Sequence, residues 1–179
     1  MNENGTHVFL ERRFEPPIDG AGVLAMAMDA ASCFGLHKVA WNGSLLGSDG
    51  RLTVCWFTAP DAESARIALR QIDADITKLW AGTVHEGPVP AVPNVLVERS
   101  FGEPVTIEEI QAIEDAGAWC LEAHNVKFAR TFFSRDRKRM ICLYEAPDAE
   151  SVRLAQREAA MPVEKIWAFR RYGLEDVTA

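Results

Sequence analysis

Side chains that can bind a metal ion or transfer a proton occur twice in this chain at the same spacing. Cys33, His37 and Cys55 recur 87 residues later as Cys120, His124 and Cys142. A thiol and an imidazole four residues apart on a helix share one face, and both bind borderline-soft divalent metals. The alternatives are ordinary ones. A buried cysteine commonly packs a helix against a sheet, and Val39 and Trp41 continue the parity of His37, which favours His37 as the start of a strand.

Two glutamates are a second candidate. Glu11 and Glu98 each lie in an expected strand, next to Phe9 and Leu96, where an apolar residue is expected if that face is buried. A buried carboxylate is costly unless it is paired or bound to a metal. The alternative is a solvated position or an ion pair with Lys78 on a neighbouring strand. The predicted metal ligands are therefore His37, His124, Glu11, Glu98, Cys55 and Cys142.

These recurrences belong to a repeat that covers most of the chain. Residues 8–87 and 95–174 align without a gap, and 24 of the 80 aligned pairs are identical. Residues 59–64 and 146–151 share the sequence Ala-Pro-Asp-Ala-Glu-Ser. Such a repeat predicts two similar structural units within one chain. We expect one unit over residues 1–87, a proline-rich linker over 88–93 and a second unit over 94–179.

Each copy predicts the element order β-α-β-β-α-β, which is the split βαβ of ferredoxin-like domains. The pair Asp49-Gly50 indicates a hairpin. A capping box from Thr106 to Glu109 indicates the start of a helix to about residue 123, and Asp61 and Asp148 are expected N-caps of later helices. The strands at residues 53–57 and 140–144 are apolar at both parities, so both faces should be buried. We therefore expect an α+β fold of two ferredoxin-like units packed sheet to sheet as an α+β barrel within one chain.

The bulk composition sets limits on partners. The formal net charge of −7 divides into −4 for residues 1–87 and −3 for the rest, which disfavours nucleic acid as a partner. No apolar run approaches the 18 residues that span a membrane, and no secretory signal is visible. We expect a cytoplasmic protein whose four cysteines are free thiols.

Four parts of the second copy carry a family resemblance. Residues 95–101 read Val-Leu-Val-Glu-Arg-Ser-Phe, and His124-Asn125-Val126, Asp136 and the run from Cys142 to Glu150 follow. This pattern resembles a family of small bacterial ferredoxin-like domains of unassigned function, some of which are described as nickel-binding proteins. The first copy matches less closely, with Phe57 and Thr58 in place of Tyr144 and Glu145. The resemblance implies a dimeric α+β barrel, here fused into one chain, and a divalent transition metal such as nickel.

Three functions stay open on the sequence alone. The first is a protein that binds a transition metal, nickel among the candidates, or a small apolar ligand. The second is an enzyme that uses the barrel interior in the manner of cofactor-independent oxygenases, with Glu11 or His124 as the base. The third is a non-catalytic interaction module, and further homodimer formation is compatible with each.

Overall fold

The protein has a mixed α+β fold in a computed structural model that describes residues 5–177. These residues form eight strands and six helices. The chain divides into two compact units, unit 1 (Met1–Gly82 with Arg170–Ala179) and unit 2 (Thr83–Phe169). These units differ from the expected domains at their ends, because the last strand of each copy continues into the other unit.

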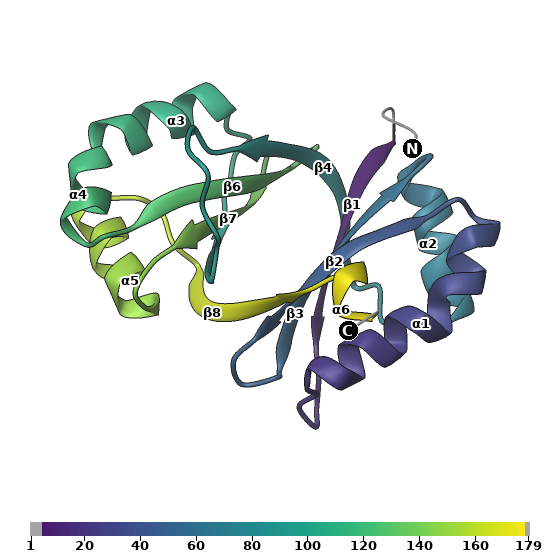
Figure 1. The fold of residues 1–179 in the computed structure, drawn as a ribbon. Helices are drawn as coiled ribbons and strands as arrows, with labels where there is room; N and C mark the ends of the chain where they lie inside the picture. The colour runs from purple at the N-terminus through teal and green to yellow at the C-terminus, as the bar shows by residue number, and fades with distance from the viewer. Residues whose placement is uncertain (1–4, 178–179) are drawn as a thin grey trace. The chain divides into compact units, whose positions relative to one another are not determined.

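Unit 1 has an antiparallel sheet with two helices on one face (Figure 1). Its strands are β1 (Thr6–Arg13), β2 (Ala40–Gly47), β3 (Leu52–Ala59) and the first part of β4 (Lys78–Glu86). The helices are α1 (Gly20–Leu36) and α2 (Ala62–Gln71). Strand β1 pairs with both β3 and β4, and β2 pairs with β3, so the order is β4-β1-β3-β2. Unit 1 also includes the end of β8 (Lys165–Tyr172) and the short helix α6 (Leu174–Val177).

Unit 2 repeats this order of elements. Its strands are β5 (Val95–Ser100), β6 (Lys127–Ser134), β7 (Arg139–Glu145) and most of β8 (Lys165–Tyr172). Its helices are α3 (Ile107–Ala116), α4 (Ala118–Ala123) and α5 (Ala149–Glu158). The strands pair in the order β8-β5-β7-β6. Both units therefore have the expected order of elements, while their packing sheet to sheet stays a prediction.

The helices begin where the sequence indicates. The Asp61 carboxylate accepts from Ser64 N at 2.7 Å, and Asp148 accepts from Ser151 N at the same distance. Thr106 and Glu109 form the expected capping box. The helix that was expected to run to residue 123 is instead broken at Gly117. A Cβ at Gly117 would lie 2.6 Å from Ala159 Cβ, so α3 and α4 meet where only glycine allows α5 to approach.

The core of each unit lies between its helices and its sheet. In unit 1 the helix residues Val23, Ala30 and Phe34 pack with Leu10 and Phe57 of the strands. In unit 2 the central strand β7 is buried at both parities, since Ile141, Cys142, Leu143 and Tyr144 are each at most 2% exposed. Burial of both faces confirms the prediction for β7, whereas in β3 Cys55 and Trp56 are only half-buried, so the prediction is only partly met there.

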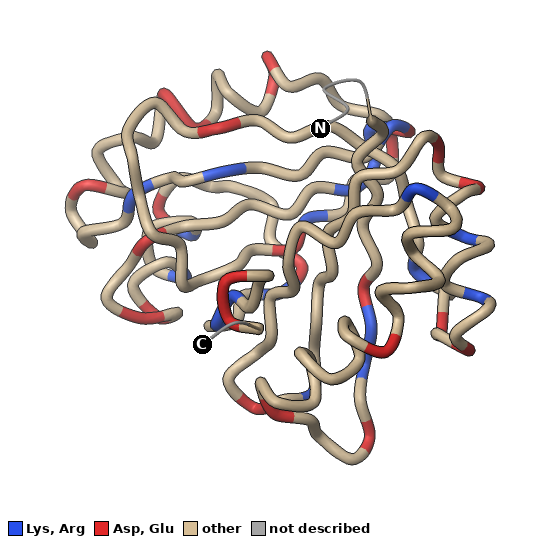
Figure 2. Tube along the Cα trace, turned by 45° about the vertical axis from the view of Figure 1, so that its right-hand side comes forward, with Lys and Arg blue, Asp and Glu red and all other residues tan. Residues whose placement is uncertain are grey.

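Basic and acidic residues are both distributed along the trace (Figure 2). None of the described helices is long and apolar enough to span a membrane.

Candidate functional site

The two predicted glutamates are held by indole donors. Glu11, whose side chain is 8% exposed, accepts a hydrogen bond from Trp80 Nε1 at 2.8 Å and lies 3.9 Å from Lys78 Nζ. Glu98 accepts from Trp167 Nε1, also at 2.8 Å, and pairs with Arg139 Nη2 at 2.7 Å. Each carboxylate is therefore compensated by a donor on a neighbouring strand.

The two predicted strand cysteines lie on the opposite face of their sheets from these glutamates. Cys55 pairs with Leu10 and Val54 with Glu11, which places Cys55 on the helix side. Cys55 Sγ accepts from Ser44 Oγ at 3.1 Å, and Cys142 Sγ accepts from Thr131 Oγ1 at 3.2 Å. Burial raises the pKa of both thiols, so both sulfurs stay protonated at neutral pH.

The two predicted histidines end helices. His37 is the C-cap of α1 and β2 begins at Ala40, so the expectation that His37 opens the strand is wrong. The helix continues because His37 N and Val39 N bond carbonyls of its last turn. His37 Nε2 and Cys33 Sγ bond the same atom, Gln71 Oε1, at 2.9 and 3.1 Å.

In unit 2 a carboxylate, Glu158, takes the place of Gln71. His124 ends α4, and its Nε2 lies 3.2 Å from Glu158 Oε2. Gln71 and Glu158 are 87 residues apart, each at the C-terminal end of the second long helix. Neither Gln71 nor Glu158 was predicted from the sequence, although both align in the same repeat as the two histidines.

The six predicted ligands thus occupy three separate places in each unit: the glutamates on one sheet face, the cysteines on the other, and the histidines at helix ends. Within residues 5–177, no three His, Cys, Asp or Glu side chains gather where they could hold one metal ion. The structure instead joins each histidine to a glutamine or glutamate of the neighbouring helix.

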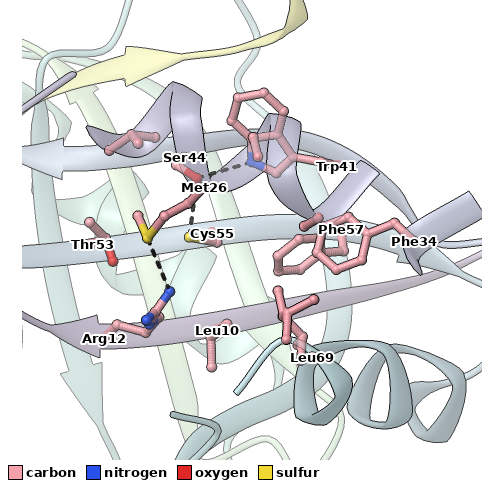
Figure 3. Close-up of a pocket in the computed structure, with 14 residues that line it drawn as sticks. Leu10, Arg12, Met26, Phe34, Trp41, Ser44, Thr53, Cys55, Phe57 and Leu69 are labelled. Carbon is pink, nitrogen blue, oxygen red and sulfur yellow. Dashed lines mark hydrogen bonds between the residues drawn. The ribbon is translucent and has the colours of Figure 1, made fainter. Parts of the chain in front are cut away.

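A pocket lies between the helices and the sheet of unit 1 (Figure 3). It has a volume of about 40 Å³. Its walls are mostly apolar, with a few polar groups, and are formed by Leu10, Arg12, Val23, Met26, Ala27, Ala30, Phe34, Trp41, Ser44, Thr53, Cys55, Phe57, Leu69 and Ile72.

A β-bulge arranges one wall of this pocket. The register of β2 against β3 shifts between Trp41 and Gly43, and Gly43 has a φ of +140°. Because of the extra residue, Trp41 and Ser44 face the same side although they are three residues apart. Trp41 Nε1 donates to Ser44 Oγ at 3.0 Å, and Ser44 in turn donates to Cys55. Simple strand alternation places Trp41 and Ser44 on opposite faces, so sequence parity could not have predicted this contact.

Two of the polar groups, Arg12 and Thr53, lie at one end of the pocket. In Figure 3 Arg12 and Thr53 lie at one side, and Phe34, Phe57 and Trp41 at the other. The Thr53 hydroxyl is buried and has no hydrogen-bond partner within residues 5–177. The Arg12 guanidinium contacts Met26 Sδ at 3.8 Å and the Phe14 ring at 4.6 Å from its centroid.

Unit 2 has a buried arginine at the position aligned with Arg12. Arg99 is 0% exposed and donates to Gln156 Oε1 at 2.6 Å, Pro162 O at 2.5 Å and Tyr144 Oη at 3.1 Å. Tyr144 Oη donates onward to Glu114 Oε1 at 3.2 Å. Oxygen acceptors of the protein therefore bind both Nη atoms of this cation, while its buried Nε has no hydrogen-bond partner among the described residues.

Comparisons with known proteins agree with the fold. A family model described as nickel responsive protein SCO4226-like matches residues 96–168, which lie within unit 2. A search of the curated proteins gives no match.

Solved structures of chlorite dismutase from Candidatus Nitrospira defluvii share the fold. A mutant of this enzyme in complex with cyanide is 11% identical and has a TM-score of 0.56, with 99% of this chain and 94% of that chain covered. A second mutant is 13% identical and has a TM-score of 0.54, with 98% and 94% covered. At such identities the likeness shows a shared fold and transfers no activity.

Proposed function

We propose that this protein binds a small ligand, and that the ligand occupies the pocket of unit 1. The observation that carries this proposal is the buried hydroxyl of Thr53, which lies in the wall of an apolar cavity and lacks a hydrogen-bond partner in the part of the chain that the structure describes. A buried polar group without a hydrogen bond costs about 1–3 kcal/mol, and folded proteins rarely keep one without a reason. A ligand that accepts a hydrogen bond from Thr53 removes this cost.

The size of the pocket limits what enters. A water molecule needs about 10–15 Å³ of such space, so a pocket of about 40 Å³ accommodates a group of a few non-hydrogen atoms. Its aromatic and aliphatic walls favour an apolar body, and Arg12 with Thr53 supply the polar contacts that orient it. The protonated Cys55 thiol contributes packing and is a poor nucleophile.

Xenon and 1-propanol, two small neutral probes, test whether the pocket opens to ligands. We expect both to shift the NMR signals of the Leu10, Val23 and Leu69 methyl groups in the full chain, in a saturable way. Ala30→Leu fills the cavity from α1 and should abolish the shifts. The amide spectrum of Ala30→Leu should match that of the wild type away from the pocket, which shows that the variant is folded. Absence of any shift with either probe in the wild-type protein contradicts the proposal.

A transition metal is a second candidate, favoured by the recurring helix-end clusters and by the nickel responsive family model. We propose His37 and His124 as its ligands, assisted by Cys33 in unit 1 and by Glu158 in unit 2. Imidazole, thiol and carboxylate fit nickel, zinc or copper in type. In number the described donors fall short of three per ion, so water would complete the coordination. Glu11, Glu98, Cys55 and Cys142 stay candidate ligands, although none of the contacts described above joins them to a histidine.

Calorimetric titration of the untagged protein with NiCl₂ tests this second candidate. We expect binding that His124→Ala removes in unit 2, and a gain in affinity for Gln71→Glu, which gives unit 1 the carboxylate of unit 2. His85→Ala removes an imidazole from outside the clusters and should bind nickel as the wild type does. If the wild-type protein takes up no nickel, zinc or copper, the metal candidate is wrong and the pocket proposal is unaffected.

A further inference from the structure

We infer that the pocket of unit 1 selects a small monocarboxylate, whose anionic head lies against Arg12 and Thr53 and whose short apolar body lies among the aromatic side chains. This inference rests on the proposed ligand pocket and names the chemical class of its ligand. It comes from comparing the two units at aligned positions.

In unit 2 the protein itself supplies hydrogen-bond acceptors to the buried guanidinium of Arg99. Arg99 has lost all contact with solvent, and the oxygens of Gln156, Tyr144 and Pro162 take its hydrogen bonds. A buried guanidinium requires such acceptors, because an uncompensated buried charge costs several kcal/mol. Unit 2 therefore supplies acceptors for both Nη atoms from its own chain, whereas the buried Nε of Arg99 has no hydrogen-bond partner within residues 5–177.

In unit 1 other residues replace these acceptors. The residues 87 positions before Gln156, Tyr144 and Glu114 are Leu69, Phe57 and Ala27. Each replacement removes the polar atoms and keeps or reduces the size of the side chain. All three residues line the cavity. Unit 1 thus has the cation, Arg12, but lacks the side-chain oxygens that accompany Arg99 in unit 2. The cavity lies beside Arg12 instead.

The rest of the described part of unit 1 does not supply a substitute. Arg12 is half-buried, so solvent reaches part of its guanidinium. Among the described residues its side chain contacts the Met26 thioether and the Phe14 ring. No ion pair of 4 Å or less joins Arg12 to a carboxylate among the described residues. Hydrogen bonds to Asp75 Oδ1 from the Thr77 hydroxyl and, at 3.0 Å, from the Thr77 backbone N lower the pKa of Asp75, and the charge of Arg12 lowers it further. The carboxylate nearest in this respect to Arg12 is therefore already bound by Thr77.

These three observations define the ligand. A carboxylate presents two coplanar oxygens, which match the donors of a guanidinium, and one of them can also accept from the Thr53 hydroxyl. A single cation balances one negative charge, which favours a monocarboxylate over a phosphate dianion. The space of about 40 Å³ and the walls of Leu69, Phe57 and Trp41 limit the body to a short alkyl group. Acetate and propionate have this chemistry and size.

Titration of the full chain with sodium propionate, monitored by the Trp41 indole N–H and the Leu69 methyl signals, tests the inference. We expect saturable binding, at least 10-fold weaker binding of the isosteric neutral amide propionamide, and at least 10-fold weaker propionate binding to Arg12→Met. Arg12→Lys should recover part of the affinity, since it restores the charge without the planar donors. Arg70→Met removes an exposed positive charge from α2 and should bind propionate as the wild type does.

A further variant uses the internal comparison directly. Leu69→Gln places beside Arg12 the amide that Gln156 provides in unit 2, and should abolish propionate binding because the protein then supplies the acceptor. The inference is overturned if propionamide binds as tightly as propionate, or if Arg12→Met keeps the wild-type affinity. In either case 1-propanol and xenon still report on the pocket, so the ligand class can fail while the proposed binding function stands. If the wild-type protein binds none of xenon, 1-propanol and propionate, both the proposed ligand pocket and the inferred ligand class are wrong.

Discussion

Trp80 Nε1 donates to Glu11 Oε1 at 2.8 Å, and Trp167 Nε1 donates to Glu98 Oε1 at the same distance. In both pairs the tryptophan lies on the strand next to that of the glutamate, 69 residues further along the chain. This contact explains how each sheet accommodates a carboxylate at a position where the pattern of the strand predicts an apolar residue. The two pairs differ in their cations, since Glu98 meets a mostly buried arginine and Glu11 meets a mostly exposed lysine.

The difference in cations predicts unequal effects of mutation. Glu98→Ala removes one of the two carboxylates that pair with Arg139, whose side chain is 14% exposed, and leaves only the half-exposed Glu164 at 2.6 Å among the ion pairs described. It also leaves the Trp167 indole N–H without its acceptor, so it should lower the free energy of unfolding by about 3 kcal/mol. Glu11→Ala mainly removes the indole hydrogen bond, because the solvent already screens Lys78, and should cost about 1–2 kcal/mol. Urea unfolding of both variants measures the difference. Equal losses would contradict the stronger role assigned to the arginine pair.

The acceptors around Arg99 give a second prediction. Gln156→Leu removes the acceptor at 2.6 Å from a fully buried guanidinium and should cost about 2–4 kcal/mol. Adding Arg99→Met to this variant removes the stranded charge, so the double variant should be more stable than Gln156→Leu alone. Urea midpoints of the wild-type protein, both single variants and the double variant form the test. A double variant less stable than Gln156→Leu would show that Arg99 still finds compensation without the glutamine.

The order of elements could be predicted from the sequence because it depends on local signals. The caps at Asp61, Thr106 and Asp148 and the turn at Gly50 each fix a boundary through contacts between near neighbours. The break at Gly117 was not predicted, since it depends on the approach of Ala159 from another helix. Helix propensity within residues 107–123 gives no information about that contact.

The candidate site was less accessible to sequence reasoning. The repeat identified His37, His124 and the glutamates as recurring residues, but recurrence does not state which of them share a face. The pairing of Leu10 with Cys55 separates the cysteines from the glutamates, and the bulge after Trp41 changes the parity of β2. The pocket was not predicted because it arises from differences between the copies, such as Leu69 at the position aligned with Gln156. The site predictions used only the residues that are identical in the two copies.

Two glycines give a matched pair of substitutions. Gly117→Ala places a methyl group 2.6 Å from Ala159 Cβ, so the helices must shift, and we expect a loss of about 1–3 kcal/mol. Gly35 lies in α1 with nothing within 4 Å of an added Cβ, and Gly35→Ala should stabilise the protein by about 0.5–1 kcal/mol. Thermal unfolding of both variants compares them under identical conditions. A stabilising effect at both positions would mean that the approach of Ala159 does not require glycine at position 117.

The helix caps predict how stability changes with pH. Backbone hydrogen bonds from Ser64 and Ser151 lower the pKa of Asp61 and Asp148 in the folded protein, whereas an aspartate in an unfolded chain titrates near 3.9. A depressed folded pKa means that the unfolded chain takes up the proton first as the pH falls. The caps therefore contribute their charge-dependent stability above about pH 4, and this contribution is lost as the pH falls through the folded pKa values.

The double variant Asp61→Asn/Asp148→Asn separates charge from hydrogen bonding, because the amide oxygen still accepts from the helix but does not titrate. We expect its urea midpoint near that of the wild type at pH 7 and a shallower decrease between pH 5 and pH 3. Asp61→Ala/Asp148→Ala removes the acceptor as well, and should lower the midpoint at pH 7 too. If the asparagine variant loses stability with acid as steeply as the wild type, other carboxylates carry the acid response and the caps act through their hydrogen bonds alone.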